Sequence, residues 1–296
     1  MKRAVLIVNP QASRVDDASL AEVERRLMRA AYLRTLRTED RGHAIELARA
    51  AADADAVVVF SGDGGFNEVL NGTDRSDLPL GFVPGGGTSV LPRALGLPRD
   101  PVEAADRIAD ALEHDRTRVI STGRVNGRRF AFSAGLGVDA EAVRRIEVRG
   151  RSSEGARPGD AAFVATFARL LVERRARFDP ALEIHGHGRA AFVLVANVHP
   201  YTYVKALALK IAPEVMFEEG LDFLAPVSIR PATLPRLLRY VFTGKGSPDV
   251  LKGHNLDRIE VTCDERMPLQ ADGEDLGDVV EVLFEAERRS LTVLAG

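Results

Sequence analysis

The residues best suited to chemistry lie in a glycine-rich segment that follows a short apolar run and contains Gly62, Asp63, Gly64 and Gly65. Glycines expose backbone N–H groups and allow close approach of a ligand, and the helix expected next offers its positive N-terminal end to an anion. The spacing matches neither the dinucleotide fingerprint Gly-x-Gly-x-x-Gly nor the Gly-Lys-Ser/Thr of a P-loop. The segment therefore predicts a phosphate cradle, with a simple strand-to-helix turn as the alternative.

Two further segments carry residues of the same kind. A second glycine cluster at residues 84–89 contains Gly87 and Thr88 and again follows an apolar run. Loops at the carboxyl ends of neighbouring parallel strands converge on the crevice where ligands of open α/β sheets bind. An acidic turn at residues 270–275 contains Asp272 and Glu274. Such turns are usually solvated, but beside a nucleotide their carboxylates hold Mg²⁺ or accept a proton from an attacking hydroxyl.

Apolar patterning predicts the elements that position the glycine segments. Short apolar runs at residues 3–8, 56–60 and 80–83 predict buried strands. Apolar residues recur at helical spacing at residues 20–31 and 43–52, which predicts helices between the first two strands. This alternation is typical of a parallel α/β sheet.

The pattern changes near residue 117. Asn126-Gly127 stands between two strand-like runs and is the strongest short-range signal for a hairpin. A second glycine-bearing turn lies within residues 181–197, and helical spacing at residues 160–177 predicts an inserted helix. Residues 290–294 predict a short last strand.

The length of 296 residues suggests about two domains. We expect an α/β nucleotide-binding domain with a parallel sheet at residues 1–117. We expect a mainly antiparallel β domain at residues 118–296, whose last strand could return to the first domain.

Composition excludes several classes of protein. Forty basic against 43 acidic residues give a net charge of −3, so no global basic surface predicts nucleic-acid binding. No uncharged stretch approaches the roughly 18 residues of a membrane span. Cys263 is the single cysteine, which excludes an intramolecular disulfide and favours a reducing cytoplasm.

Taken together, these segments resemble the diacylglycerol kinase catalytic-domain family, which includes bacterial lipid kinases and sphingosine kinases. The chain from Ser61 to Val69 is similar to the family's Gly-Gly-Asp-Gly-Thr-x-Asn-Glu-Val block, with Ser61 for a common glycine and Gly65 for the usual threonine. The resemblance extends over about residues 3–280. Further motifs follow in the family's order, namely Asn9-Pro10, Thr38 with Gly42-His43-Ala44, Pro84-Gly85-Gly86-Gly87-Thr88, Arg93-Ala94-Leu95-Gly96-Leu97-Pro98, Gly135-Leu136-Gly137-Val138-Asp139-Ala140 and Asp272-Gly273-Glu274.

The resemblance implies an α/β ATP-binding domain, a β-sandwich-like domain, and transfer of the γ-phosphate of Mg-ATP to a lipid alcohol such as diacylglycerol or a sphingoid base. It also implies a cytoplasmic protein that works peripherally at the inner face of the membrane, and it leaves a homodimer open. Two alternatives remain: a kinase of a soluble acceptor, similar to NAD kinases, and a nucleotide-binding regulator without catalysis. The glycine at position 65 is the only support for the regulator.

The resemblance also assigns roles to single residues. It makes Asp272 the general base and Glu274 its acidic neighbour, and it places Asp63 near the metal and the phosphates. Glu219 corresponds to a structural magnesium site in the second domain. The expected contacts with nucleotide and phosphates are Asn9, Thr38, Gly62, Asp63, Gly64, Gly65, Asn67, Glu68, Gly87 and Thr88.

A basic segment is a candidate for contact with a membrane. Residues 144–157 contain five arginines and two glutamates, and the polar, glycine-rich residues 149–159 predict a mobile loop. Each basic side chain near an anionic bilayer contributes about 1 kcal/mol of attraction. We therefore expect this segment to dock on membranes, with a solvated charged loop as the alternative.

Overall fold

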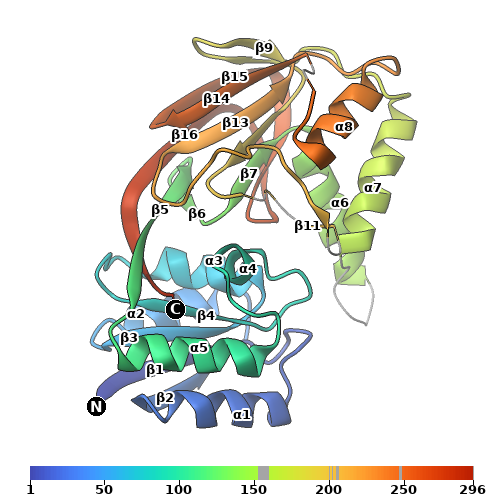
Figure 1. The fold of residues 1–296 in the computed structure, drawn as a ribbon. Coiled ribbons are helices and arrows are strands. Elements are labelled where there is room, and N and C mark those ends of the chain that lie inside the picture. The colour runs from blue at the N-terminus through green and yellow to red at the C-terminus, as the bar shows by residue number, and fades with distance from the viewer. Residues whose placement is uncertain (153–159, 200, 202, 205–206, 247–248, 296) are drawn as a thin grey trace. The chain divides into compact units, whose positions relative to one another are not determined.

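The computed structural model describes residues 1–152, 160–199, 201, 203–204, 207–246 and 249–295 (Figure 1). The chain divides into two compact units. Unit 1 comprises Met1–Ser121 and Arg288–Gly296, and unit 2 comprises Thr122–Glu287. Each unit is described by itself.

Unit 1 is built on a parallel sheet with the strand order β2-β1-β3-β4, and the end of β16 pairs in parallel with β4 through Val293 and Leu80. The strands are β1 (Lys2–Val8), β2 (Ala31–Arg37), β3 (Ala56–Ser61), β4 (Leu80–Pro84) and β16 (Glu274–Leu294). The helices are α1 (Asp17–Leu27), α2 (His43–Ala50), α3 (Asp63–Gly72), α4 (Val90–Ala94) and α5 (Pro101–Glu113). The predicted strands at residues 3–8, 56–60 and 80–83 are confirmed, and β3 is buried along its whole length.

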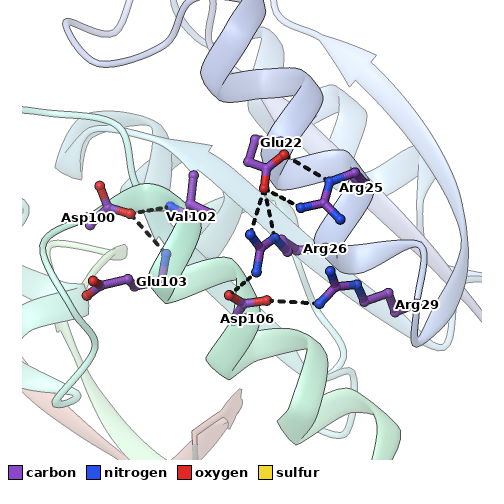
Figure 2. A network of polar contacts seen from close by, with 8 residues as sticks. All are labelled: Glu22, Arg25, Arg26, Arg29, Asp100, Val102, Glu103 and Asp106. Atoms are coloured by element: carbon purple, nitrogen blue, oxygen red, sulfur yellow. Dashed lines mark hydrogen bonds and ion pairs between the residues drawn. The ribbon is translucent and has the colours of Figure 1, made fainter.

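Charged side chains join α1 to α5 (Figure 2). Arg26 lies between Glu22, at 2.7 Å, and Asp106, at 2.5 Å, and Arg29 approaches Asp106 from the next turn. Asp100 caps α5 by accepting from the first backbone N–H groups of that helix. This network fixes two helices that border the sheet.

The helix expected over residues 20–31 ends earlier, because α1 ends at Leu27 and β2 begins at Ala31. The sequence pattern did not predict β2. Among the described strands β2 pairs only with β1, and its side chains vary between buried, half-buried and exposed, with arginines at positions 34 and 37. An edge strand of this kind has no continuous apolar run to detect.

Unit 2 is mainly antiparallel, which confirms the expected change of architecture. Its strands are the end of β5 (Thr117–Val125), β6 (Arg128–Phe130), β7 (Ser133–Leu136), β8 (Leu182–Ile184), β9 (Gly188–Ala190), β10 (Val193–Ala196), β11 (Tyr203–Val204), β12 (Leu207–Ala208), β13 (Leu221–Pro226), β14 (Val250–Leu256), β15 (Arg258–Ala271) and most of β16. Its helices are α6 (Val138–Ser152), α7 (Asp160–Glu173) and α8 (Leu234–Thr243). One apolar cluster takes residues from β5 to β10 and from β13, β15 and β16, so these strands share a core.

Two tight turns shape unit 2. Asn126 and Gly127 have φ values of +45° and +87° between β5 and β6, which confirms the predicted hairpin. Asp272 and Gly273 have φ values of +49° and +79° between β15 and β16. The acidic segment found in the sequence is therefore also a two-residue hairpin turn, and its Asp-Gly pair suits the left-handed backbone that such a turn requires.

The expectation of a loop at residues 149–159 is wrong for residues 149–152, which continue α6, while residues 153–159 lie outside the described part of the chain. Two arginines of the predicted membrane segment are held within unit 2. Arg144 pairs with Asp275 and Asp278, and Arg145 pairs with Glu141 and Glu173. Among the described residues, no helix is long and apolar enough to cross a bilayer.

Candidate functional site

Most residues predicted to bind an anion follow the carboxyl ends of the parallel strands in unit 1. Asn9 follows β1, Thr38 follows β2 and Gly62 follows β3. The Asn9 N–H donates to the carbonyl of Phe60 at 3.0 Å, and the Thr38 N–H donates to the carbonyl of Val8 at 2.9 Å. The strand order reverses between β1 and β3, and ligands of open α/β sheets bind at such a point.

The two glycine loops contact each other backbone to backbone. The Gly85 N–H donates to the carbonyl of Ser61 at 2.7 Å. A Cβ atom added to Gly86 would lie 2.9 Å from the Cα of Gly62, which is too close for any side chain. Glycine at position 86 is therefore required for this approach, and the loops after β3 and β4 form one surface.

Asp63 ties the start of α3 to the start of α4. Its carboxylate oxygens accept from the N–H groups of Val90 at 3.1 Å and Leu91 at 3.3 Å. The N-cap residue of α3, Gly62, provides no side-chain hydrogen bond. Gly62 therefore places no side chain over the first N–H groups of α3. The helix dipole gives this end of α3 a partial positive charge.

Asn67 and Glu68, two of the residues predicted to contact the nucleotide, make hydrogen bonds within unit 1. Asn67 is buried, and its backbone carbonyl and Oδ1 both accept from the side-chain amide of Asn71, at 2.9 and 3.1 Å. Glu68 accepts from the N–H of Ala44 at 3.2 Å, at the start of α2. In contrast, Gly87 is exposed, and a Cβ atom there would meet nothing within 4 Å. The nucleotide contacts of Asn67, Glu68 and Gly87 stay predictions.

The side chain of Ser61 occupies the space that a side chain at position 65 would need. A Cβ atom added to Gly65 would lie 2.1 Å from the Oγ of Ser61 and 2.7 Å from its Cβ. Ser61 is 2% exposed, and its hydroxyl has no hydrogen-bond partner among the described residues. The two departures from the family motif are therefore coupled, because the serine side chain occupies the place of a side chain at position 65.

Asp272 is held rigidly in its turn. Its Oδ2 accepts from the N–H of Ala131 at 2.6 Å, and its Oδ1 accepts from the N–H groups of Phe132 at 2.9 Å and Ser133 at 3.1 Å. The residue is 4% exposed. Backbone N–H donors stabilise the ionised carboxylate and leave it little freedom to turn.

A buried polar network supports this turn. Gln270 accepts from the N–H of Gly273 at 3.0 Å, and its amide donates to Asp139 at 2.7 Å and to Tyr201 at 3.1 Å. Tyr201 donates to Asp139 at 2.7 Å, and burial raises the pKa of this aspartate. A Cβ atom at Gly135 would lie 2.2 Å from the Asp139 carboxylate. The sequence did not predict the contact between Asp139 and Tyr201, because the local pattern around each residue does not show which distant residue it contacts.

Glu274 forms an ion pair with Arg128, and Glu274 is 9% exposed. Asp63 lies in unit 1, whereas Asp272 and Glu274 lie in unit 2. The structure thus brings together the residues within each half of the predicted site. Unit 1 holds two glycine loops in backbone contact, and unit 2 holds a carboxylate fixed by backbone donors.

The magnesium site predicted at Glu219 stays a prediction. The Oε2 atom of Glu219 is buried and has no hydrogen-bond partner among the described residues. This atom lies 3.9 Å from Nε2 of His254, and Nδ1 of His254 lies 3.0 Å from both oxygens of the buried Asp222. Asp222 also accepts from the N–H of Asn255 at 2.9 Å. Within the described ranges, no group of three or more His, Cys, Asp or Glu side chains gathers to hold a metal. The imidazole of His254 neighbours both carboxylates.

We expect His254 to make stability depend on pH. The hydrogen bond with Asp222, together with the charges of Glu219 and Glu214, raises the pKa of His254 against the opposing effect of burial. A raised folded pKa stabilises the fold fully below the unfolded value of about 6.5, and this stabilisation is lost as pH rises through the folded pKa. The Tm of the native protein should therefore exceed that of His254→Gln most near pH 6, and the gap should shrink toward about pH 9. Thermal unfolding followed by circular dichroism measures the gap, and a gap independent of pH would contradict the expectation.

Comparisons with known proteins agree with this geometry. Residues 3–148 match the family model described as the diacylglycerol kinase catalytic domain. A diacylglycerol kinase of Bacillus subtilis is 28% identical over 285 residues, which cover 93% of this chain and 90% of that protein. A diacylglycerol kinase of Staphylococcus haemolyticus is 36% identical over 135 residues, which cover 44% of this chain and 40% of that protein. The crystal structure of a diacylglycerol kinase from Bacillus anthracis has the same fold, with a TM-score of 0.74 and 21% identity over 100% of this chain and 97% of the other.

Proposed function

We propose, on the premise that residues 3–148 belong to the diacylglycerol kinase catalytic domain family, that this protein transfers the γ-phosphate of ATP to the hydroxyl group of a lipid alcohol. One observation carries the proposal. The glycine loops after β3 and β4 form a single backbone surface beside the start of α3, where Gly62 adds no capping side chain. Such a surface offers preorganised N–H donors to phosphate oxygens.

The nucleotide binds, in this proposal, across the carboxyl ends of β1 to β4. The N–H groups of Gly64 and Gly65 face the phosphates, and the loop containing Gly87 and Thr88 closes the cradle. Magnesium bound with the nucleotide supplies neutralisation of charge on the transferring phosphoryl group. Asp63 is the carboxylate that would hold it, since it stands at the start of α3, where its oxygens accept from the N–H groups of Val90 and Leu91 beside the second glycine loop.

The acceptor hydroxyl is activated, in this proposal, by Asp272. The hydroxyl oxygen attacks the γ-phosphorus, the bond between that phosphorus and the bridging oxygen breaks, and ADP leaves. Asp272 takes the hydroxyl proton, and three backbone donors support this role because they hold its carboxylate in one orientation. Glu274, neutralised by Arg128, orients the turn and does not compete as a base.

The structure bears on the alternative of a regulator without catalysis. That alternative rested on glycine in place of threonine at position 65. Contact with Ser61 explains this glycine by packing alone, so the substitution no longer argues for lost catalysis. The alternative of a soluble acceptor is separated from a lipid acceptor by experiment.

The test is transfer of labelled γ-phosphate from Mg-ATP to a panel of lipid alcohols in mixed micelles, with NAD and sugars assayed in parallel. We expect label in a lipid and in no soluble acceptor. Label only in NAD or a sugar would replace the lipid acceptor by a soluble one. Measurable ATP binding without any transfer to the panel would overturn the proposed kinase activity toward these acceptors.

A further inference from the structure

The carboxylate of Asp272 is held by residues 131–133, a short segment that leads into β7. In the sheet, β7 lies between β10 and β15 and is antiparallel to both. Asn197 directly follows β10 and Asp272 directly follows β15, so the two residues flank the segment from opposite sides. Both are buried, with Asn197 0% and Asp272 4% exposed.

The regular strand pairing ends at this segment, and side chains continue it. The last backbone bonds run from the N–H of Asn197 to the carbonyl of Phe132, at 3.0 Å, and from the N–H of Asp272 to the carbonyl of Ser133, at 2.8 Å. Next to them, Nδ2 of Asn197 donates to the carbonyl of Ala131 at 2.8 Å. On the other side, the Asp272 carboxylate accepts from the N–H groups of the segment.

Two of these N–H groups share a peptide unit with a carbonyl that Asn197 binds. The carbonyl of Ala131 and the N–H of Phe132 belong to one planar unit, and the carbonyl of Phe132 and the N–H of Ser133 belong to the next. In a trans peptide the C=O and N–H bonds point in opposite directions. Asn197 therefore binds the carbonyl end of each unit, while the N–H end of each donates to Oδ1 of Asp272, at 2.9 and 3.1 Å.

Hydrogen bonds at both ends fix the direction of the two peptide units. A peptide plane bound only at its N–H end can turn about the bonds that flank it, whereas a plane bound at both ends cannot turn without breaking a buried hydrogen bond. Hydrogen bonds in a chain also polarise one another, so the bonds to the carbonyls make the N–H groups stronger donors to the carboxylate.

We propose that Asn197 is a positioning residue for Asp272, acting through the two peptide units between them. The proposal rests on the proposed function, because it takes Asp272 to be the group that accepts the proton of the acceptor hydroxyl. Asn197 contacts neither nucleotide nor acceptor in this proposal, and it sets the orientation of the carboxylate toward the hydroxyl. The alternative is that Asn197 only stabilises unit 2 by binding a buried carbonyl.

The first test is the kinetics of two variants that remove the side-chain donor, Asn197→Leu, which keeps the branched shape, and Asn197→Ala. We expect kcat for phosphate transfer to fall about tenfold or more in both, since a small misplacement of a catalytic group is costly. The Kd and the KM for ATP should keep their native values, because Asn197 belongs to unit 2 and the proposed nucleotide cradle belongs to unit 1. A native kcat in either folded variant would overturn the proposal.

A cycle of double variants separates positioning from general support of the fold. In the Asp272→Asn background there is no carboxylate to position, so adding Asn197→Ala should lower kcat by less than about twofold. Independent effects would instead multiply. A double variant whose loss equals the product of the two single losses would overturn the proposal.

Asp222→Asn is the control for lost stability. Asp222 pairs with Ala196, the residue before Asn197, and its carboxylate accepts from the N–H of Asn255 at 2.9 Å. The control therefore weakens a buried hydrogen bond in the neighbouring strand and leaves the bonds to residues 131–133 in place. It should lower the Tm, yet keep the native kcat at a temperature where all variants are folded. If the control lost kcat in proportion to its Tm, as the Asn197 variants do, the positioning role would be refuted.

Hydrogen exchange tests the link between Asn197 and the peptide units without reference to catalysis. In Asn197→Ala the N–H groups of Phe132 and Ser133 should exchange faster than in the native protein and in Asp222→Asn, as measured by NMR. Unchanged exchange would refute the positioning role even if the native protein is a kinase. Faster exchange in a protein that transfers phosphate to no acceptor would refute the proposed function and show that Asn197 orients a carboxylate with another role.

Discussion

The variant Asp272→Asn should transfer phosphate about a hundred times more slowly than the native protein, or slower still, while its affinity for ATP stays unchanged. An amide cannot take the proton of the attacking hydroxyl, and the proposed nucleotide cradle belongs to unit 1, whereas Asp272 belongs to unit 2. Steady-state kinetics with saturating ATP give the kcat, and equilibrium binding of ATP gives the Kd.

The same substitution should also destabilise unit 2. Three backbone N–H groups point at the carboxylate, and an asparagine can offer its one oxygen only to part of them. If the oxygen faces Phe132 and Ser133, the NH₂ group faces the N–H of Ala131, and two donors oppose each other. A buried donor left without a partner costs about 1–3 kcal/mol. A fall in activity alone therefore cannot assign a catalytic role to Asp272.

Asp222→Asn is the matched control for this effect. Asp222 lies in unit 2, is also 4% exposed, and accepts from the backbone N–H of Asn255 and from His254. Its variant should lose a comparable amount of stability, measured as a shift in Tm, and keep the native kcat at a temperature where both variants are folded. If the two variants lost activity in equal measure, Asp272 would support the fold and would not be the base.

The sequence predicted elements well where the signal is local. The buried strand β3 has an unbroken apolar run, and the Asn126-Gly127 hairpin carries its turn type in two residues. The sequence did not predict β2, because this edge strand has one strand neighbour and many of its side chains lie near solvent. Helix α8 was missed as well, although Leu234, Leu237, Leu238 and Val241 recur at helical spacing, because the segment lies in a half of the chain whose pattern is mainly that of strands.

The candidate site shows the same limit. Motifs located the glycine loops and the acidic turn, and the comparisons confirm the family resemblance that the motifs indicated. Motifs could not show that the carboxylate of Asp272 accepts hydrogen bonds from backbone N–H groups some 140 residues earlier in the chain. Nor could they show that Glu68 caps α2 through Ala44. Side-chain partners distant in sequence are set by the fold, and a local pattern does not contain them.

The coupling of Ser61 and Gly65 predicts the second large effect, that Gly65→Thr destabilises unit 1 by about 1–3 kcal/mol. The new Cβ would lie 2.7 Å from the Cβ of Ser61, and no rotation of the serine side chain relieves that contact. The variant Ser61→Gly/Gly65→Thr removes both clashing serine atoms and should recover most of the lost stability. Urea unfolding followed by circular dichroism measures both variants and the Ser61→Gly single variant.

Gly87→Thr is the control, because a Cβ atom at position 87 meets nothing within 4 Å, and it should leave the free energy of unfolding near the native value. Additive costs for Ser61→Gly and Gly65→Thr would refute the coupling, whereas contact predicts an interaction energy of about 1–3 kcal/mol. The double variant also exchanges one hydroxyl for another in the cradle. If it binds ATP as tightly as the native protein, a serine hydroxyl at the end of β3 and a threonine hydroxyl at position 65 of α3 are interchangeable for ATP binding.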